Sequence, residues 1–185
     1  MKVFKVSVAG IGNVGSQVIN DLLQNNNFFL KQSLIKFEIV GISAKNKNKK
    51  RNFDINEFKW FNNPLDLITG PDPDILVELI GEENGVSYEL IKKALQNKIN
   101  VVTANKALLS MHGNELFKIA DQNNVLLLFE AAIAGGIPIV RSLKHSLFLN
   151  KIKKISGILN GTTNYILSEM HNNKHSFKKI LEDAQ

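Results

Sequence analysis

Three glycines near the amino terminus stand at a spacing that imposes a local fold. They follow an apolar run, residues 3–9, with the composition of a buried strand, and they precede apolar residues at helical spacing. The segment reads Gly10-Ile11-Gly12-Asn13-Val14-Gly15. Here Gly10 permits a tight turn, Gly12 lets the backbone approach a ligand closely, and Gly15 lets helix and strand pack. The chain is therefore expected to begin with a strand, a glycine turn and a helix.

This arrangement indicates a phosphate site. The amino end of the expected helix would offer free N–H groups and a partial positive charge to phosphate. GxGxxG between a strand and a helix is typical of sites for the pyrophosphate of a dinucleotide. The alternative is an ordinary turn that needs glycine for its backbone geometry alone. We favour the dinucleotide site, because the pattern predicts both flanking elements.

The next part of the chain repeats the alternation of strand and helix. Further strands are predicted at 37–42, 75–80, 100–103 and 125–129, with helices at 86–96 and 113–122. The aromatic segment 53–61 follows neither period. Buried strands alternating with helices predict an α/β fold with a doubly wound parallel sheet of the Rossmann type.

The pattern changes after Gly135. We expect a helix from Pro138 to about Leu149, a strand at 152–159, a polar loop at 160–164, and helices from Tyr165 and Ser176. These elements are too few to close a core. We therefore expect a dinucleotide-binding domain at 1–134 and the start of a second, mixed α+β domain at 135–185, in a chain that is a fragment.

Composition narrows the classes of function. The 185 residues contain no cysteine, which argues against thiolate metal sites and against dehydrogenases that act through a thioester. The longest apolar stretch, 125–140, contains Glu130 and Pro138 and is shorter than the ~20 residues of a membrane span. We expect a cytoplasmic protein without a membrane or secretory segment.

The basic excess is partly local. Lys and Arg outnumber Asp and Glu by 23 to 17, for a formal net charge of +6. Five basic residues lie between Lys45 and Arg51, and the others are scattered with few aromatic residues beside them. This distribution argues against a nucleic-acid partner.

The segment after the second strand indicates which dinucleotide is bound. An acidic residue usually ends this strand in NAD-binding folds, where it binds the ribose 2′-hydroxyl. Here no carboxylate occurs before Asp54. Ser43, Lys45 and Lys47 could instead bind a 2′-phosphate through charge-assisted hydrogen bonds. The alternative is a solvated loop, and the pattern favours NADP over NAD.

Three further motifs carry polar residues next to predicted strands. Lys106 follows the strand 100–103 and so lies at the carboxyl edge of the sheet, where ligands bind; alternatively, it caps a turn in solvent. Glu130 lies among small residues whose carbonyls could join it around a hard cation, but a capping or salt-bridged Glu130 fits equally well. Asn160, Gly161 and Thr162 could orient a polar substrate, or a threonine there could be an N-cap.

Five motifs, in their order, resemble homoserine dehydrogenase. They read GIGNVG, VELIG, VVTANKALL, FEAAIAGGIPI and GILNGTTNYIL, and the resemblance runs from Val6 to about Met170. It implies an NAD(P)-dependent oxidoreductase that interconverts L-aspartate 4-semialdehyde and L-homoserine, in the biosynthesis of threonine, methionine and isoleucine. It also implies a small-molecule substrate and, for the full-length enzyme, a homodimer.

The resemblance implies residue roles as well. Residues 10–15, with Ala44 and Lys45, would line the cofactor, and Thr103 and Lys106 would lie beside the nicotinamide and the substrate. Lys106 would be the local candidate for the cation or proton donor at the substrate oxygen.

A metal site follows from the resemblance too. Glu130 and the carbonyls of Ile133, Gly135 and Ile137 would match the family's monovalent-cation site, usually Na⁺.

The resemblance also indicates what these residues lack. The family's next segment, a Gly-Tyr-x-Glu-x-Asp-Pro run followed by an Asp and a Lys, supplies substrate ligands and the catalytic lysine. It is absent from the 185 residues. Activity of the chain alone therefore does not follow, and a catalytically empty NADP-binding module remains the alternative. Because Met1 directly precedes the first strand, no fused aspartate kinase is expected.

Overall fold

The computed structural model describes residues 1–158, 161–173 and 176–184. The chain divides into two compact units, Met1–Ala132 and Ile133–Gln185. The division falls two residues before the boundary that we expect from the sequence.

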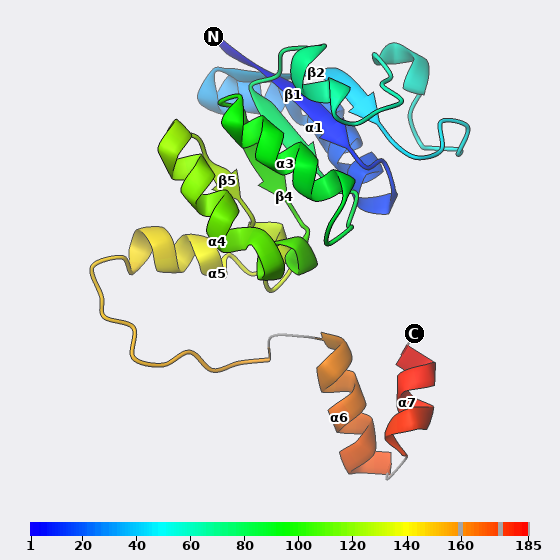
Figure 1. Ribbon diagram of the computed structural model, residues 1–185, viewed down its shortest axis with the longest axis vertical. Coiled ribbons are helices and arrows are strands. Elements are labelled where there is room, and N and C mark those ends of the chain that lie inside the picture. Colours follow the sequence, from blue (N-terminus) through cyan, green and yellow to red (C-terminus); the bar gives the residue numbers. More distant parts are fainter. Residues whose placement is uncertain (159–160, 174–175, 185) are drawn as a thin grey trace. The chain divides into compact units, whose positions relative to one another are not determined.

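The first unit is built on a five-stranded parallel sheet in the order β2-β1-β3-β4-β5 (Figure 1). Its strands are β1 (Lys2–Ala9), β2 (Ile35–Ser43), β3 (Ile75–Glu78), β4 (Asn100–Thr103) and β5 (Leu127–Leu128). From β1 the chain moves to β2 on one side and then crosses to β3 on the other. The strand order reverses between β1 and β3, and ligands of open parallel sheets bind at the carboxyl ends of strands at such a switch point.

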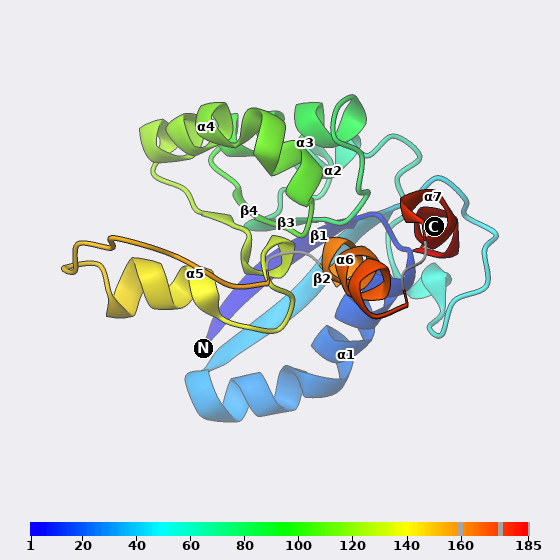
Figure 2. The same cartoon turned by 90° about the horizontal axis from the view of Figure 1, so that it is seen from below.

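Helices cover both faces of this sheet. α1 (Asn13–Ser33) lies on one face, and α3 (Val86–Gln96) and α4 (Lys106–Asn123) lie on the other, as Figure 2 shows. Two shorter elements, η1 (Ile55–Glu57) and α2 (Asp66–Thr69), precede β3. The predicted Rossmann-type α/β fold is confirmed.

The hydrophobic pattern explains why the two faces are filled. Side chains of β1 alternate, so that Val6 and Val8 join a buried cluster with Ile19 of α1, while Ala9 joins the cluster on the opposite face. On that opposite face, α3 buries a stripe that runs along one side of the helix. Its residues are Leu90, Ile91, Ala94 and Leu95, all fully buried.

The aromatic segment 53–61 adds a short extension beside β2. Trp60 forms an isolated parallel bridge with Ile42, whose main-chain N–H donates to the oxygen of Lys59 at 2.9 Å. The Trp60 indole donates to Oδ1 of Asn62, also at 2.9 Å. Tertiary contacts therefore order a segment for which its own periodicity predicts no element.

Within the described residues of the second unit, the regular elements are helical. They are α5 (Ile139–Arg141), the π-helical η3 (Ser142–Ser146), α6 (Gly161–Asn173) and α7 (Phe177–Ala184). α6 and α7 pack against each other, and Ile166 and Ile180 are their buried apolar residues.

Several predicted elements are corrected. The strand predicted at 152–159 is wrong as far as residue 158, because the segment has no neighbouring strand and exposes Ile152, Ile155 and Ile158. The polar loop predicted at 160–164 is wrong from Gly161 onward, where α6 begins. Leu159 and Asn160 lie outside the described residues.

Other elements differ from the expectation in length, and the last strand and the fourth helix are two of them. The last strand pairs over two residues only, Leu127–Leu128. The fourth helix begins seven residues earlier than expected, at Lys106, because the Asn105 side chain caps it by accepting from the N–H of Leu108.

Candidate functional site

A cleft of about 490 Å³ lies at the carboxyl ends of β1 and β2, at the switch point of the sheet. Three segments line it: the glycine turn after β1, the end of β2 with the loop that follows, and the residues after β3. The lining comprises Gly10, Ile11, Gly12, Ser43, Ala44, Lys45, Asn46, Lys49, Arg51, Asn62, Pro64, Leu79, Ile80, Glu82 and Val86.

The three glycines of the turn have two different reasons to be glycine. Gly10 has a φ of +92°, and a Cβ there would overlap the main chain of Leu79. A Cβ on Gly15 would overlap the carbonyl oxygen of Gly10. Gly12 is different, because a Cβ there would meet no atom within 4 Å. Packing therefore requires Gly10 and Gly15, whereas Gly12 keeps the space above the turn open.

The amino end of α1 points its free donors into this region. Gly12 is the N-cap and has no side chain to accept a hydrogen bond, and the first turn carries no acidic residue. The N–H of Ser16 is bonded to the oxygen of Gly12 at 2.9 Å, so the N–H groups of residues 13–15 precede the first helical bond. Open space above uncapped helical N–H groups fits a dinucleotide pyrophosphate.

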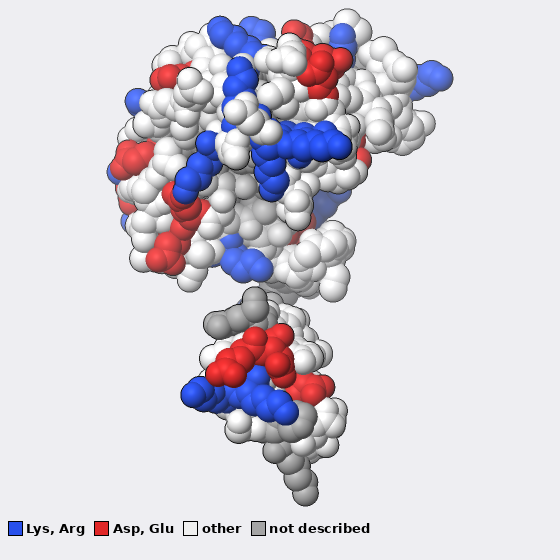
Figure 3. Space-filling model, turned by 90° about the vertical axis from the view of Figure 1, so that its right-hand side faces the viewer, with Lys and Arg blue, Asp and Glu red and all other residues white. Residues whose placement is uncertain are grey.

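A basic loop, residues 45–51, forms the wall of the cleft opposite the glycine turn. Lys45, Lys47 and Lys49 are exposed, and the Arg51 guanidinium lies over the Trp60 ring, 5.7 Å from its centroid. Figure 3 looks onto the side of the molecule on which this loop lies, and Lys and Arg side chains gather there. Positive charge on this wall favours an anionic ligand.

The structure brings some of the predicted cofactor residues together. Gly10, Ile11, Gly12, Ala44 and Lys45 share the cleft. Asn13 lines an adjoining hollow of about 470 Å³, and Val14 is 59% exposed on the first turn of α1. The positions agree with the expected cofactor site, and the binding roles themselves stay predictions.

Thr103 and Lys106 lie elsewhere. Thr103 is fully buried at the end of β4, and its hydroxyl donates to the Glu78 carboxylate at 2.7 Å. Lys106 is the first residue of α4 and is exposed. Neither residue lines the cleft, so their proposed places beside the nicotinamide and the substrate stay predictions.

The residues of the predicted cation and substrate sites fall in both units. Glu130 belongs to η2 (Glu130–Ala132) of the first unit, whereas Ile133, Gly135 and Ile137 belong to the second. Within the second unit, Gly135 has a φ of +59°, and the carbonyl of Ile137 accepts from the N–H of Ile139 at 2.8 Å.

Of the predicted substrate residues, Gly161 and Thr162 begin α6 and are exposed. Asn160 lies outside the described residues. Both the cation site and the substrate site stay predictions.

Sequence reasoning missed two polar residues of this region. Glu78 is fully buried at the carboxyl end of β3, and Arg51 donates to four main-chain oxygens. A carboxylate at the end of an otherwise apolar strand was a signal for Glu78. One arginine among four lysines was a weaker signal for Arg51.

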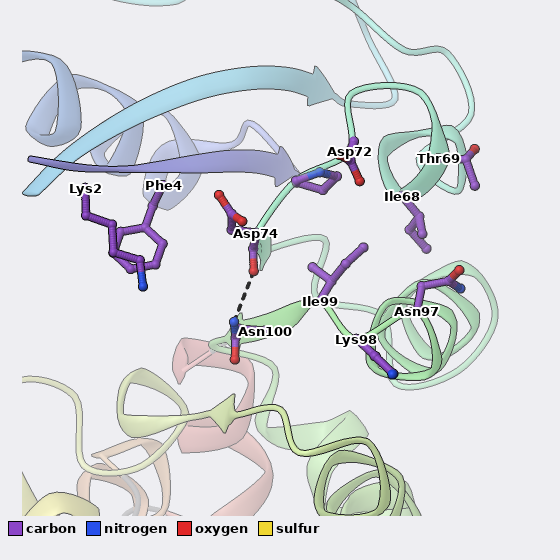
Figure 4. A pocket seen from close by; sticks show the side chains of 11 residues that line it. Lys2, Phe4, Ile68, Thr69, Asp72, Asp74, Asn97, Lys98, Ile99 and Asn100 are labelled. Carbon is purple, nitrogen blue, oxygen red and sulfur yellow. Dashed lines mark hydrogen bonds between the residues drawn. The ribbon is translucent and has the colours of Figure 1, made fainter.

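A second cavity, of about 530 Å³, opens at the amino ends of the strands (Figure 4). Its labelled side chains come from β1, from α2 and from the segments that lead into β3 and β4. Asn100 Nδ2 donates to the main-chain oxygen of Asp74 at 3.2 Å. Ligands of open parallel sheets bind at the carboxyl ends of strands. The cleft at the glycine turn is therefore the better candidate.

Family comparison agrees with this assignment. A family model described as "Homoserine dehydrogenase, NAD binding domain" matches residues 10–130. The chain belongs to the homoserine dehydrogenase family. A second model, described as "Homoserine dehydrogenase", matches residues 138–185. The family is one of oxidoreductases of amino-acid biosynthesis, and its NAD-binding domain contains the cleft.

Individual relatives show the same likeness over the whole chain. The homoserine dehydrogenase of Pseudomonas aeruginosa is 39% identical over 185 residues, and that of Bacillus subtilis is 37% identical; each match covers all of this chain and 42% of the relative. The crystal structure of a homoserine dehydrogenase from Thiobacillus denitrificans is 36% identical, with a TM-score of 0.86, and that of Staphylococcus aureus at pH 7.5 is 33% identical, with a TM-score of 0.79. The chain covers 42% of each of these structures as well, so it spans about two fifths of the length of these homoserine dehydrogenases.

Among the described residues, no helix combines the length and the apolar composition that a membrane span needs. The same residues contain no group of three or more His, Cys, Asp or Glu side chains that could hold a metal ion.

Proposed function

We propose that this chain binds NADP(H) in the cleft at the glycine turn and serves an enzyme that interconverts L-homoserine and L-aspartate 4-semialdehyde. The observation that carries the proposal is the open space at Gly12, directly above the uncapped N–H groups of α1. When bound, the cofactor supplies the hydride chemistry. The chain's own residues bind it, orient it and supply charge.

The cofactor's phosphates would meet two sets of donors. The N–H groups at the start of α1 bind the pyrophosphate, with Gly12 allowing the close approach. Lys45 and Lys49 line the cleft beside the end of β2 and bind the 2′-phosphate. The acidic residue in the lining, Glu82, follows β3 rather than β2, so it is not at the usual position of an NAD-selecting carboxylate.

Lys106 is the proposed source of charge for the reaction. It follows β4 at the carboxyl edge of the sheet and begins α4. An ammonium group there stabilises the alkoxide that develops at the substrate oxygen and can donate a proton to it.

Other parts of the proposal concern the second unit and the assembly. Glu130 and the carbonyls of Ile133, Gly135 and Ile137 are proposed to hold a monovalent cation, Na⁺. Gly161 and Thr162 are proposed to contact the substrate. The enzyme is proposed to act as a cytoplasmic homodimer.

Turnover tests the enzymatic part of the proposal. The chain is joined to the part of the Pseudomonas relative that follows the matched region, and NADP⁺ reduction with L-homoserine is followed by absorbance. We expect turnover, and Lys106→Ala should lower kcat about tenfold or more, whereas Lys118→Ala on the exposed side of α4 should not. A folded hybrid that binds NADPH but lacks turnover would contradict the proposed reaction. A near-normal rate in Lys106→Ala would remove its role.

A second candidate function is cofactor binding without turnover. The observation that favours it is that Lys106, the proposed catalytic residue, does not line the cleft. The same assay on the 185 residues alone distinguishes the two. NADPH binding without homoserine oxidation supports the binding module, and oxidation by the chain alone excludes it.

A further inference from the structure

A buried carboxylate joins the ends of two neighbouring strands beside the cleft. The Glu78 side chain, at the end of β3, has no exposed surface. Its Oε1 accepts from the N–H of Ile80 at 2.9 Å and from that of Gly81 at 3.4 Å. Its Oε2 accepts from the hydroxyl of Thr103, at the end of β4, at 2.7 Å. One side chain thus connects β4 with the segment that leaves β3.

The connection continues into the first turn of α4. The Thr103 hydroxyl oxygen accepts from the N–H of Asn105 at 3.0 Å. Asn105 Nδ2 donates to the main-chain oxygen of Glu82 at 2.6 Å, and its Oδ1 caps the helix through the N–H of Leu108 at 3.1 Å. Glu78, Thr103 and Asn105 therefore form one chain of hydrogen bonds, which we name the strand-end network.

Burial of this carboxylate is not required for a parallel sheet of this kind. The preceding β3 residues Ile75, Leu76 and Val77 are apolar, and an apolar residue at position 78 would avoid the cost of burying a charge. Glu78 takes no part in the ion pairs Lys5–Asp72 and Lys92–Glu115 that the described residues form. The carboxylate is instead stabilised by donors from the backbone and from Thr103.

The network ends at two places that the proposed function uses. Leu79, Ile80 and Glu82 line the cleft, and the segment that contains them is bonded at both its ends, to Glu78 and to Asn105. Lys106 directly follows the N-cap residue Asn105, so the cap sets where α4 begins and where Lys106 lies.

We propose that Glu78 is a positioning residue that, through Thr103 and Asn105, holds segment 79–82 and the start of α4 in the geometry for cofactor binding and catalysis. The proposal rests on the proposed function for its consequence on NADP(H) binding. The network itself can be tested without cofactor.

Three variants address the network. Glu78→Gln has nearly the same size but replaces one accepting oxygen with an NH₂ donor and removes the negative charge. At least one of the three donors to residue 78 therefore loses its acceptor, and the hydrogen bonds that remain are no longer charge-assisted. Thr103→Val removes the hydroxyl that both Glu78 and Asn105 use, whereas Thr103→Ser keeps it. Ser7→Ala is the matched control, because Ser7 is a fully buried β1 residue outside the cleft lining, bonded to the Leu67 oxygen at 3.4 Å.

Amide hydrogen exchange in the cofactor-free chain is the first measurement. The N–H groups of Ile80 and Gly81 in Glu78→Gln, and that of Asn105 in Thr103→Val, should exchange about tenfold faster than in the parent chain. Ser7→Ala should leave the exchange rates of these three N–H groups unchanged, even if the variant melts at a lower temperature. Unchanged exchange in both Glu78→Gln and Thr103→Val would overturn the network.

NADPH titration is the second measurement. We expect the dissociation constant to rise about tenfold in Glu78→Gln and in Thr103→Val, and to stay within about threefold in Thr103→Ser and Ser7→Ala. If the parent chain binds NADPH, faster exchange with unchanged affinity in both network variants would overturn the positioning role. A parent chain that binds no NADPH would overturn the proposed function, and the exchange data would still decide the network. If Glu78→Gln fails to fold, the Thr103 pair decides both questions.

Discussion

Arg51 Nε lies 3.3 Å from the main-chain oxygen of Ile11 and donates a hydrogen bond to it. Through Nη1 the same guanidinium donates to the oxygens of Lys47 and Lys49, and through Nη2 it donates to that of Asn46, at 2.8 to 3.1 Å. Arg51 therefore folds the basic loop around its own side chain and ties that loop to the glycine turn. The two walls of the cleft share this one anchor.

Arg51→Lys should weaken cofactor binding although it keeps the charge. A lysine ammonium cannot reproduce the planar fork that reaches several carbonyl oxygens at once. We expect the dissociation constant for NADPH to rise about tenfold. The chain's only tryptophan, Trp60, lies under the guanidinium and provides a fluorescence signal for the titration. Arg141→Lys, the same substitution on α5, is the control, and an unchanged affinity in Arg51→Lys would remove the anchor role.

Preference for NADPH over NADH should depend on Lys45 and Lys49. Both lysines line the cleft, and the 2′-phosphate is the group that distinguishes the two cofactors. The double variant Lys45→Ala, Lys49→Ala should raise the dissociation constant for NADPH about tenfold and leave that for NADH nearly unchanged. Competitive titrations measure both constants. Equal affinities of the parent chain for the two cofactors would contradict the NADP preference itself.

The packing of α3 against α4 should depend on pH through a surface cluster. Two hydrogen bonds, the stronger influence from Lys92 and the weaker from Tyr88, lower the pKa of Glu115 below its ordinary value of 4.5. Hydrogen bonds with Tyr88, the larger cause, and with Glu115 raise the pKa of Lys92 above its ordinary value of 10.5. The stabilisation by Glu115 is thus complete above pH 4.5 and is lost as the pH falls through the lowered pKa of Glu115. The stabilisation by Lys92 is complete below pH 10.5 and is lost as the pH rises through the raised pKa of Lys92.

Thermal melting at several pH values measures this cluster. Between about pH 6 and about pH 3, the melting temperature of the parent chain should fall by more than that of Glu115→Gln, which lacks the titrating carboxylate. The effect should be small and should shrink in high salt, because both side chains are accessible to solvent. Parallel curves for the two proteins would contradict the assignment.

Elements with a clear period were predictable, and those set by distant contacts were not. The helix Val86–Gln96 and the strand Asn100–Thr103 match their predicted bounds, because the apolar stripe of the helix lies between Gly85 and Asn97 and the apolar centre of the strand lies between two polar residues. The strand predicted at 152–159 failed as far as residue 158, because an isoleucine-rich segment forms a strand only beside a partner strand.

The candidate site shows the same division. The glycine turn is predictable from a local pattern, because Gly10 has a positive φ and Gly15 packs against the Gly10 carbonyl within one strand–turn–helix unit. The close approach of Leu79 to Gly10 is a distant contact that the pattern does not show. The contact between Glu78 and Thr103 joins residues 25 positions apart, and the bond from Arg51 reaches back 40 positions to Ile11. Sequence spacing carries no direct signal for such contacts.

The central claim is that the space above Gly12 is where the cofactor's pyrophosphate lies. Because a Cβ at Gly12 meets no atom within 4 Å, Gly12→Val should fold with a nearly unchanged melting temperature. The same reasoning predicts that Gly15→Ala is destabilised, since its methyl group would overlap the Gly10 carbonyl oxygen.

The most direct measurement is therefore an NADPH titration of the Gly12→Val chain beside the parent chain, with melting curves for both. We predict that the parent binds and that Gly12→Val, equally stable, loses binding, because its side chain occupies the place of the phosphates. A folded Gly12→Val chain that binds NADPH with the parent's affinity would contradict the account.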